Sequence, residues 1–175
     1  RYLSAFQNGD GGFGHGLEPD FWLPQSSPMA SWMAAQILLE IGATPNNEVV
    51  RKLLTYLMET TQVQPGMWQS VLPDTNFHPH APWWHWHEDV QQSWMFNPSV
   101  ELAACLIFWS TPGSAEANLG WISLEYAVRR LMNATTVERH ELSNYRNALS
   151  LLSGQQESFV ENVKYSMGEV SQKVQ

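Results

Sequence analysis

The chain has 175 residues, 43% of them hydrophobic, which is enough for one ordinary domain with a core of its own. Its formal net charge is −8 and it has no basic cluster, which argues against nucleic-acid binding. No apolar run reaches the roughly 18 residues that a membrane-spanning helix needs, so we expect a soluble protein without a membrane span.

The single cysteine, Cys105, lies inside an apolar run and has no partner for an internal disulfide. A lone buried thiol fits a reducing compartment. With no signal peptide in the sequence, this favours a cytoplasmic protein.

Helix signals recur along the chain and strand signals are almost absent, which predicts an all-α fold. Ser27 and Pro28 supply a cap residue and a first-turn proline for a helix over 29–41, and Gly42 ends it. Nearly every position of that helix is apolar or small, so it should be buried on most sides. The next helix, over 47–61, carries a single apolar stripe and should lie outside with one face inward.

The same kind of helix start recurs at Asn97 and Pro98, with Asn97 as the expected cap. It predicts a second buried helix over 100–109, followed by an amphipathic helix over 119–132. Two more helices are expected: one that begins with a capping box at Thr135–Glu138 and runs to about 152, and a more polar one over 157–173.

The spacing of glutamine, glycine and an aromatic residue suggests a repeat. Gln7, Gly11 and Phe13 are matched by Gln62, Gly66 and Trp68, which gives repeat-like units over 1–42 and 47–111 within a single domain of 1–175. The helical part over 115–175 is less typical. Compared with the first unit, the second has about fifteen extra residues before its proline-started helix, and insertions of this kind usually lie at a functional face.

In an array of alternating helical hairpins, every loop that leads from an outer to an inner helix lies at the same end. The loops 8–27 and 63–96 are both of that kind, whereas the opposite turns are short. The two long loops are therefore expected to meet at one mouth of the fold.

The stretch Gln7-Asn8-Gly9-Asp10-Gly11-Gly12-Phe13 resembles the repeat of the terpenoid cyclase and protein prenyltransferase superfamily. The stretches 12–20 and 79–84 resemble an uncharacterised bacterial group with the same repeat. What this resemblance implies is an α/α toroid, with inner and outer helices around a central cavity. This chain has few hairpins for a closed ring, so an incomplete ring or a part of a longer protein is expected. The acidic motif and the zinc ligands of those families have no match here, so no catalytic residue is transferred.

A segment rich in histidine and tryptophan, residues 78–89, is the strongest candidate for a site. It holds four of the six histidines and three of the nine tryptophans in a loop broken by prolines. Within it His78 and His80, and likewise His85 and His87, are spaced to present two imidazoles to one divalent metal ion, with Glu88, Asp89 or Asp20 completing the shell. A histidine that exchanges protons without a metal is an equally open interpretation.

The earlier loop contributes His15, Glu18 and Asp20. If residues 18–20 are extended, the two carboxylates face one side, and paired carboxylates suit acid–base catalysis because each shifts the pKa of the other. Alternatively, they cap helix N-termini or keep the loop solvated.

Five tryptophans of the two loops could form a stacking surface for sugar rings, a prenyl chain or a cation: Trp22, Trp83, Trp84, Trp86 and Trp94. The alternative is that some of them simply close the end of the helical barrel.

The favoured hypothesis is an enzyme, a hydrolase or lyase, that acts on a carbohydrate or glycan-like substrate at the toroid mouth. Its expected catalytic residues are Glu18, Asp20, His15 and His80, and its expected substrate-binding residues are Trp22, Trp83, Trp84, Trp86 and Asp74. Two alternatives stay open: an isoprenoid-handling cyclase or transferase-like enzyme, and a non-catalytic module that binds a sugar or a peptide.

Overall fold

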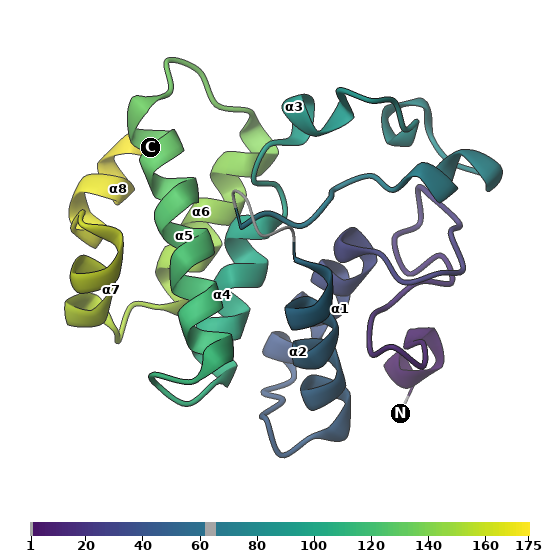
Figure 1. The fold of residues 1–175 in the computed structure, drawn as a ribbon, viewed down its shortest axis with the longest axis horizontal. Coiled ribbons are helices and arrows are strands. Elements are labelled where there is room, and N and C mark those ends of the chain that lie inside the picture. Colours follow the sequence, from purple (N-terminus) through teal and green to yellow (C-terminus); the bar gives the residue numbers. More distant parts are fainter. Residues whose placement is uncertain (1, 62–65) are drawn as a thin grey trace. The chain divides into compact units, whose positions relative to one another are not determined.

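A computed structural model of the chain describes residues 2–61 and 66–175. Within this part the fold is all-helical, with eight α-helices, three short 3₁₀ helices and isolated β-bridges in place of strands (Figure 1). No helix among these residues is both long and apolar enough to span a membrane. The described chain forms two compact units: the first holds residues up to 61 together with 68–95, and the second holds 66–67 and 96–175.

The first unit contains two regular helices followed by a loop region with short helical turns. In chain order its elements are η1 (Leu3–Phe6), α1 (Pro28–Glu40), α2 (Glu48–Thr60), η2 (Pro73–Phe77), η3 (Pro82–Trp84) and α3 (Val90–Trp94). The predicted start of α1 is confirmed, because the Ser27 side chain accepts a hydrogen bond from the backbone N–H of Ala30 at 3.1 Å. The predicted amphipathic α2 is confirmed as well, since its buried residues lie on one face.

The glycine-rich turn after η1 ties the start of the chain to α2. The Gln7 side chain donates hydrogen bonds to the backbone carbonyls of Gly11, at 2.9 Å, and Val49, at 3.0 Å. Phe13 is fully buried and its carbonyl accepts a hydrogen bond from the backbone of Ser27. The motif therefore has a structural role in this copy. In the second copy, Gln62 lies outside the described residues.

The second unit is built around one central buried helix. Its elements are α4 (Ser99–Trp109), α5 (Ala115–Asn133), α6 (Arg139–Leu151), α7 (Gln156–Val163) and α8 (Met167–Lys173). As predicted, α4 is buried almost all round, and it packs against both α5 and α6 (Figure 1). Gly120 permits the close approach of α5, because a Cβ there would lie 2.7 Å from the Ala103 carbonyl oxygen.

Two predicted N-caps in the second unit are wrong. Pro98 itself is the N-cap of α4, so Asn97 lies one residue too early to cap it. The N-cap of α6 is Glu138, whose carboxylate accepts hydrogen bonds from the backbone of His140 and Glu141, so there is no capping box at Thr135. At α6 the Glu138 carboxylate thus satisfies the free N–H groups of the first turn in place of Thr135.

The predicted last helix over 157–173 is two helices. Lys164 has a left-handed backbone, with φ of 66°, and ends α7. A capping box between Ser166 and Glu169 then starts α8. The sequence of this region is polar throughout, so its periodicity did not reveal the break.

Replacing Gly11 by alanine should destabilise the first unit, because Gly11 has φ of +92° and its new Cβ would lie 2.1 Å from the Lys52 carbonyl oxygen. The left-handed backbone alone costs about 1–2 kcal/mol for a residue with a Cβ, and the clash adds to this. Urea unfolding measures the loss. Gly9→Ala is the matched control, since no atom lies within 4 Å of a Cβ there. Equal stability of the two variants would contradict this account.

Candidate functional site

The two long loops lie side by side in the first unit, joined by backbone hydrogen bonds. The N–H of Trp22 donates to the carbonyl of Pro79 at 2.9 Å, and the N–H of Ala81 donates to the carbonyl of Asp20 at 2.8 Å. Phe21 and His80 face each other between these bonds as an antiparallel bridge. We call residues 20–22 and 79–81 the loop pair. The predicted meeting of the two loops is confirmed for the part of 63–96 that belongs to this unit.

The loop pair has two faces, because successive side chains of an extended segment point to opposite sides. Phe21 and His80 share one face, since residues that face each other in an antiparallel pair point the same way. Asp20 and Trp22, on either side of Phe21, are both exposed.

An aromatic cluster anchors the first of these faces. Trp84 is 5% exposed and stacks on Trp94 with ring centroids 4.4 Å apart, and it also packs at a tilt against Phe21 at 5.0 Å. Trp86 is partly buried against the same cluster. Trp84 is therefore a core residue and offers no stacking surface to a ligand. For this tryptophan the structure agrees with the alternative expectation, that some of the five close the end of the helical part.

Trp22 and Trp83 are the two exposed indoles of the loops, with exposed fractions of 62% and 58%. The Nε1–H of Trp22 donates to the carbonyl of Pro19 at 3.1 Å, which holds the ring against the preceding turn. A flat aromatic face that is fixed yet exposed can stack on a ligand without losing much conformational freedom. Trp22 therefore fulfils the geometric requirement for a binding platform.

Glu18 and Asp20 lie in a turn, so the expectation of an extended segment is wrong. The N–H of Phe21 donates to the Glu18 carbonyl at 3.3 Å, and the N–H of Asp20 reaches the Glu18 carboxylate at 3.4 Å. Burial raises the pKa of Glu18, and the charge of Asp20 adds to this rise, while the hydrogen bond from the Asp20 backbone opposes it. Asp20 is exposed. The two neighbouring carboxyl groups are therefore in unequal environments, as acid–base catalysis requires.

The histidines contact one another in a different pairing from the predicted one. Nε2 of His80 lies 3.2 Å from Nδ1 of His85, with the rings stacked at a centroid distance of 5.4 Å. Nδ1 of His80 lies 2.6 Å from the carbonyl oxygen of His78. Because a carbonyl only accepts, His80 must carry a proton on Nδ1. A neutral His80 then accepts from His85 through Nε2.

Two nitrogen ligands of a tetrahedral zinc ion, each bonded at about 2.0 Å, lie roughly 3.3 Å apart. The nitrogens of His80 and His85 have about this separation. Among the described residues, no group of three or more histidine, cysteine, aspartate or glutamate side chains is placed to hold a metal. The predicted donors from His78, His87, Glu88 and Asp89 do not complete such a group. The observed contact is accounted for by a hydrogen bond between the two rings.

His15 belongs to a separate polar network below the glycine-rich turn. Its Nε2 lies 2.8 Å from Oδ1 of Asn8, while the Asn8 amide nitrogen donates to the Pro24 carbonyl and to Oγ of Ser26, each at 3.0 Å. Ser26 in turn donates to Asp10 at 2.7 Å. No described hydrogen bond joins His15 to His80. Asn8 and Ser26 escaped the sequence analysis because such residues are common in any loop.

Asn76 fixes the histidine- and tryptophan-rich segment and was also missed. Its side chain donates to the Trp86 carbonyl at 2.9 Å and accepts from the Trp86 N–H at 2.8 Å, as a paired strand would. It lies in η2, whose first turn carries the exposed Asp74. These two hydrogen bonds hold the segment in place beyond the loop pair.

Comparison with known proteins gives no match: no family model, no curated protein and no solved structure matches the chain.

The raised pKa of Glu18 makes the stability of the protein depend on pH. A carboxyl group whose pKa is raised by folding binds its proton more tightly in the folded protein. Its contribution to stability is therefore present below the ordinary glutamate pKa and is lost as the pH rises through the pKa of the folded state. Between about pH 4 and pH 7, the wild type should therefore lose stability relative to Glu18→Gln, as measured by urea unfolding. A constant difference would contradict the raised pKa.

Removing the charge of Asp20 should lower the pKa of Glu18 towards its ordinary value, because that charge opposes ionisation of Glu18. Carbon-13 NMR of the Glu18 side-chain carboxyl in Asp20→Asn measures the change directly. Asp74→Asn removes an exposed charge elsewhere in the same unit and should leave Glu18 unchanged. An equal effect of both substitutions would mean that the general charge of the protein, and not Asp20, acts on Glu18.

Proposed function

We propose that the exposed face of the loop pair binds a carbohydrate or glycan-like substrate and acts on it by acid–base chemistry, as a hydrolase or a lyase. One observation carries this proposal: the backbone pairing of residues 20–22 with 79–81 anchors a short segment in which Asp20 and Trp22 are both exposed. Sugar rings have apolar faces that match an indole, and their glycosidic bonds react by proton transfer from and to carboxyl groups.

The roles follow from the environments of the side chains. Glu18 keeps its proton to a higher pH than an ordinary glutamate and is the proposed proton donor. Asp20 is exposed beside it and is the proposed proton acceptor. Trp22 positions the sugar, and Trp83 supplies a second exposed indole in the neighbouring loop. His80 and His15 are assigned no step, since both ring nitrogens of His80 contact His78 and His85, and His15 belongs to the Asn8 network.

The α/α toroid belongs to this proposal too. Two pairs of consecutive helices, α1 with α2 and α4 with α5, are each joined by a short connection, 41–47 and 110–114, as hairpins of a toroid are. Helical toroids with a cavity suit carbohydrate-active sites, but this link is an analogy at the level of the fold.

A non-catalytic sugar-binding module is the second candidate. It is favoured by the exposure of Trp22 and Trp83 above a core-anchored loop pair, which is sufficient for stacking without any reaction. The two candidates differ in one property: a binding module retains its affinity and shows no turnover, whereas an enzyme consumes its ligand.

Truncating Trp22 should weaken binding of an oligosaccharide selected on an array of defined glycans. Loss of one stacked ring costs about 1 kcal/mol, roughly a fivefold rise in Kd by isothermal titration. Tyr2→Ala is the control, because Tyr2 is equally aromatic, 92% exposed and outside the loop pair. Unchanged affinity in Trp22→Ala would remove the platform from the site.

The carboxyl groups are tested by turnover of the same oligosaccharide. Glu18→Gln and Asp20→Asn should each lower kcat by about 10²–10⁴-fold while changing KM little, because a general acid or base acts in the transition state. Glu59→Gln, which removes an exposed charge near the end of α2, is the control. Full activity in both variants would overturn the assignment of Glu18 and Asp20, and binding without turnover in the wild type would favour the binding module.

A further inference from the structure

His80 and His85 present two imidazole nitrogens to each other, and neither residue has a step in the proposed carbohydrate chemistry. Nε2 of His80 lies 3.2 Å from Nδ1 of His85, whereas the ring centroids are 5.4 Å apart. The two nitrogens are therefore on the sides of the rings that face each other. His85 is exposed and His80 is half-buried, so solvent and dissolved ions reach the pair.

A backbone carbonyl fixes the tautomer and the orientation of His80. Nδ1 of His80 carries a proton, because it lies 2.6 Å from the carbonyl oxygen of His78, which only accepts. In the neutral ring, the lone pair is then on Nε2, the nitrogen that faces His85. Histidines that bind metal ions almost always donate their other ring N–H to a carbonyl, a carboxylate or water, which orients the ring and makes the ligating nitrogen more basic. This bond is independent of the contact with His85 and gives His80 the form of a metal ligand.

The separation of the two nitrogens also suits a bound ion. It is 3.2 Å, close to the roughly 3.3 Å between two nitrogen ligands of a tetrahedral zinc ion. Zinc can therefore replace the hydrogen bond between the rings with little movement of either side chain. Within residues 2–61 and 66–175, no third histidine, cysteine, aspartate or glutamate side chain joins the pair. Water fills the remaining coordination positions of such an ion.

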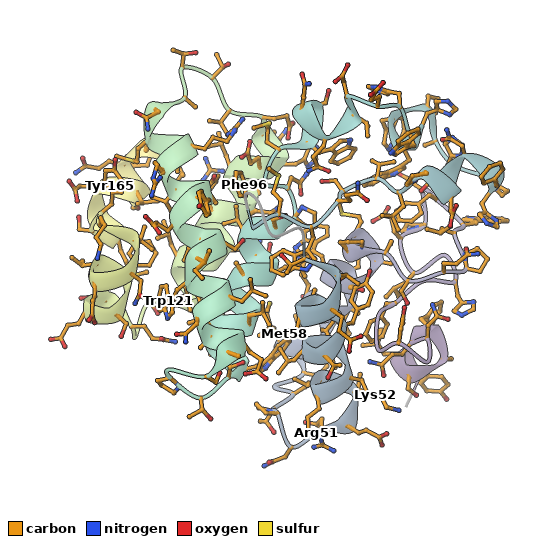
Figure 2. All side chains as sticks on the ribbon, viewed as in Figure 1. Arg51, Lys52, Met58, Phe96, Trp121 and Tyr165 are labelled. Carbon is orange, nitrogen blue, oxygen red and sulfur yellow. The ribbon has the colours of Figure 1, made fainter. Side chains whose placement is uncertain are left out.

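The charges of the first unit favour a cation at this pair. Residues 68–95 include no lysine or arginine, but they include three exposed acids: Asp74, Glu88 and Asp89. The described cationic side chains of the unit, Arg51 and Lys52, lie on α2 (Figure 2). Both make their bonds within that helix and the turn before it. The loop that carries the histidines thus attracts divalent cations.

We propose that His80 and His85 bind a divalent transition-metal ion that prefers imidazole, such as zinc, through Nε2 of His80 and Nδ1 of His85. In the free protein, Nδ1 of His85 donates its proton to the hydrogen bond with His80. When the metal binds, this proton leaves to water and another is taken up on Nε2 of His85, so both facing nitrogens give a lone pair to the metal. The site does not rest on the carbohydrate function, and the failure of either leaves the other standing.

Titration of the full chain with zinc chloride tests the site, with the imidazole nitrogen-15 NMR signals as the readout. The signals of His80 and His85, assigned with single histidine variants, should shift saturably. His85 should change from the tautomer with its proton on Nδ1 to the one with its proton on Nε2. Magnesium chloride should leave both rings unchanged, because Mg²⁺ prefers oxygen ligands. An unchanged tautomer of His85 at saturating zinc, or the same shifts with magnesium, would overturn the proposal.

His80→Gln and His85→Gln should each weaken zinc binding at least about tenfold by isothermal titration, since even groups that only orient a metal ligand contribute about this much. The matched controls are His78→Gln and His87→Gln, which remove neighbouring imidazoles but keep the His78 carbonyl that bonds His80. Both should bind zinc as the wild type does. An equal loss in all four variants would show adventitious binding by any histidine of the loop and would refute the site. Circular dichroism of each variant checks that the helices remain formed.

Discussion

The candidate site of the first unit depends on two backbone hydrogen bonds, Trp22 to Pro79 and Ala81 to Asp20. They join loops that are far apart in the sequence, and they fix which side chains share a face. Because successive side chains of an extended segment point to opposite sides, a shift by one residue would move Trp22 to the core side and Phe21 to the solvent. The register thus determines that one aromatic ring is buried and its neighbour is presented to a ligand.

Burial of the aromatic cluster maintains this register. Phe21 and Trp84 pack at a tilt, and Trp84 stacks on Trp94 from α3, so both loops are held by the same apolar contacts. The Asn76 side chain fixes the following residues through the backbone of Trp86. A rigid support of this kind suits a binding face, since less entropy is lost when a ligand binds a preorganised surface.

The two units place their polar residues in different ways. In the first unit the unusual residues gather in paired loops, whereas the helices α4 to α8 of the second are joined by short connections without histidine or tryptophan. The loops of the first unit, in contrast, are conspicuous by composition alone.

The sequence by itself determined the helical class, the N-cap of α1, the apolar stripe of α2, the burial of α4 and the meeting of the two long loops. These follow from local rules: caps, side-chain periodicity and the alternation of hairpins. Only the tertiary structure decided that Trp84 is core while Trp22 is exposed, that His80 pairs with His85, and that Glu18 lies in a turn with a raised pKa. The reason is that burial, register and desolvation depend on residues distant in the chain, which no local spacing encodes.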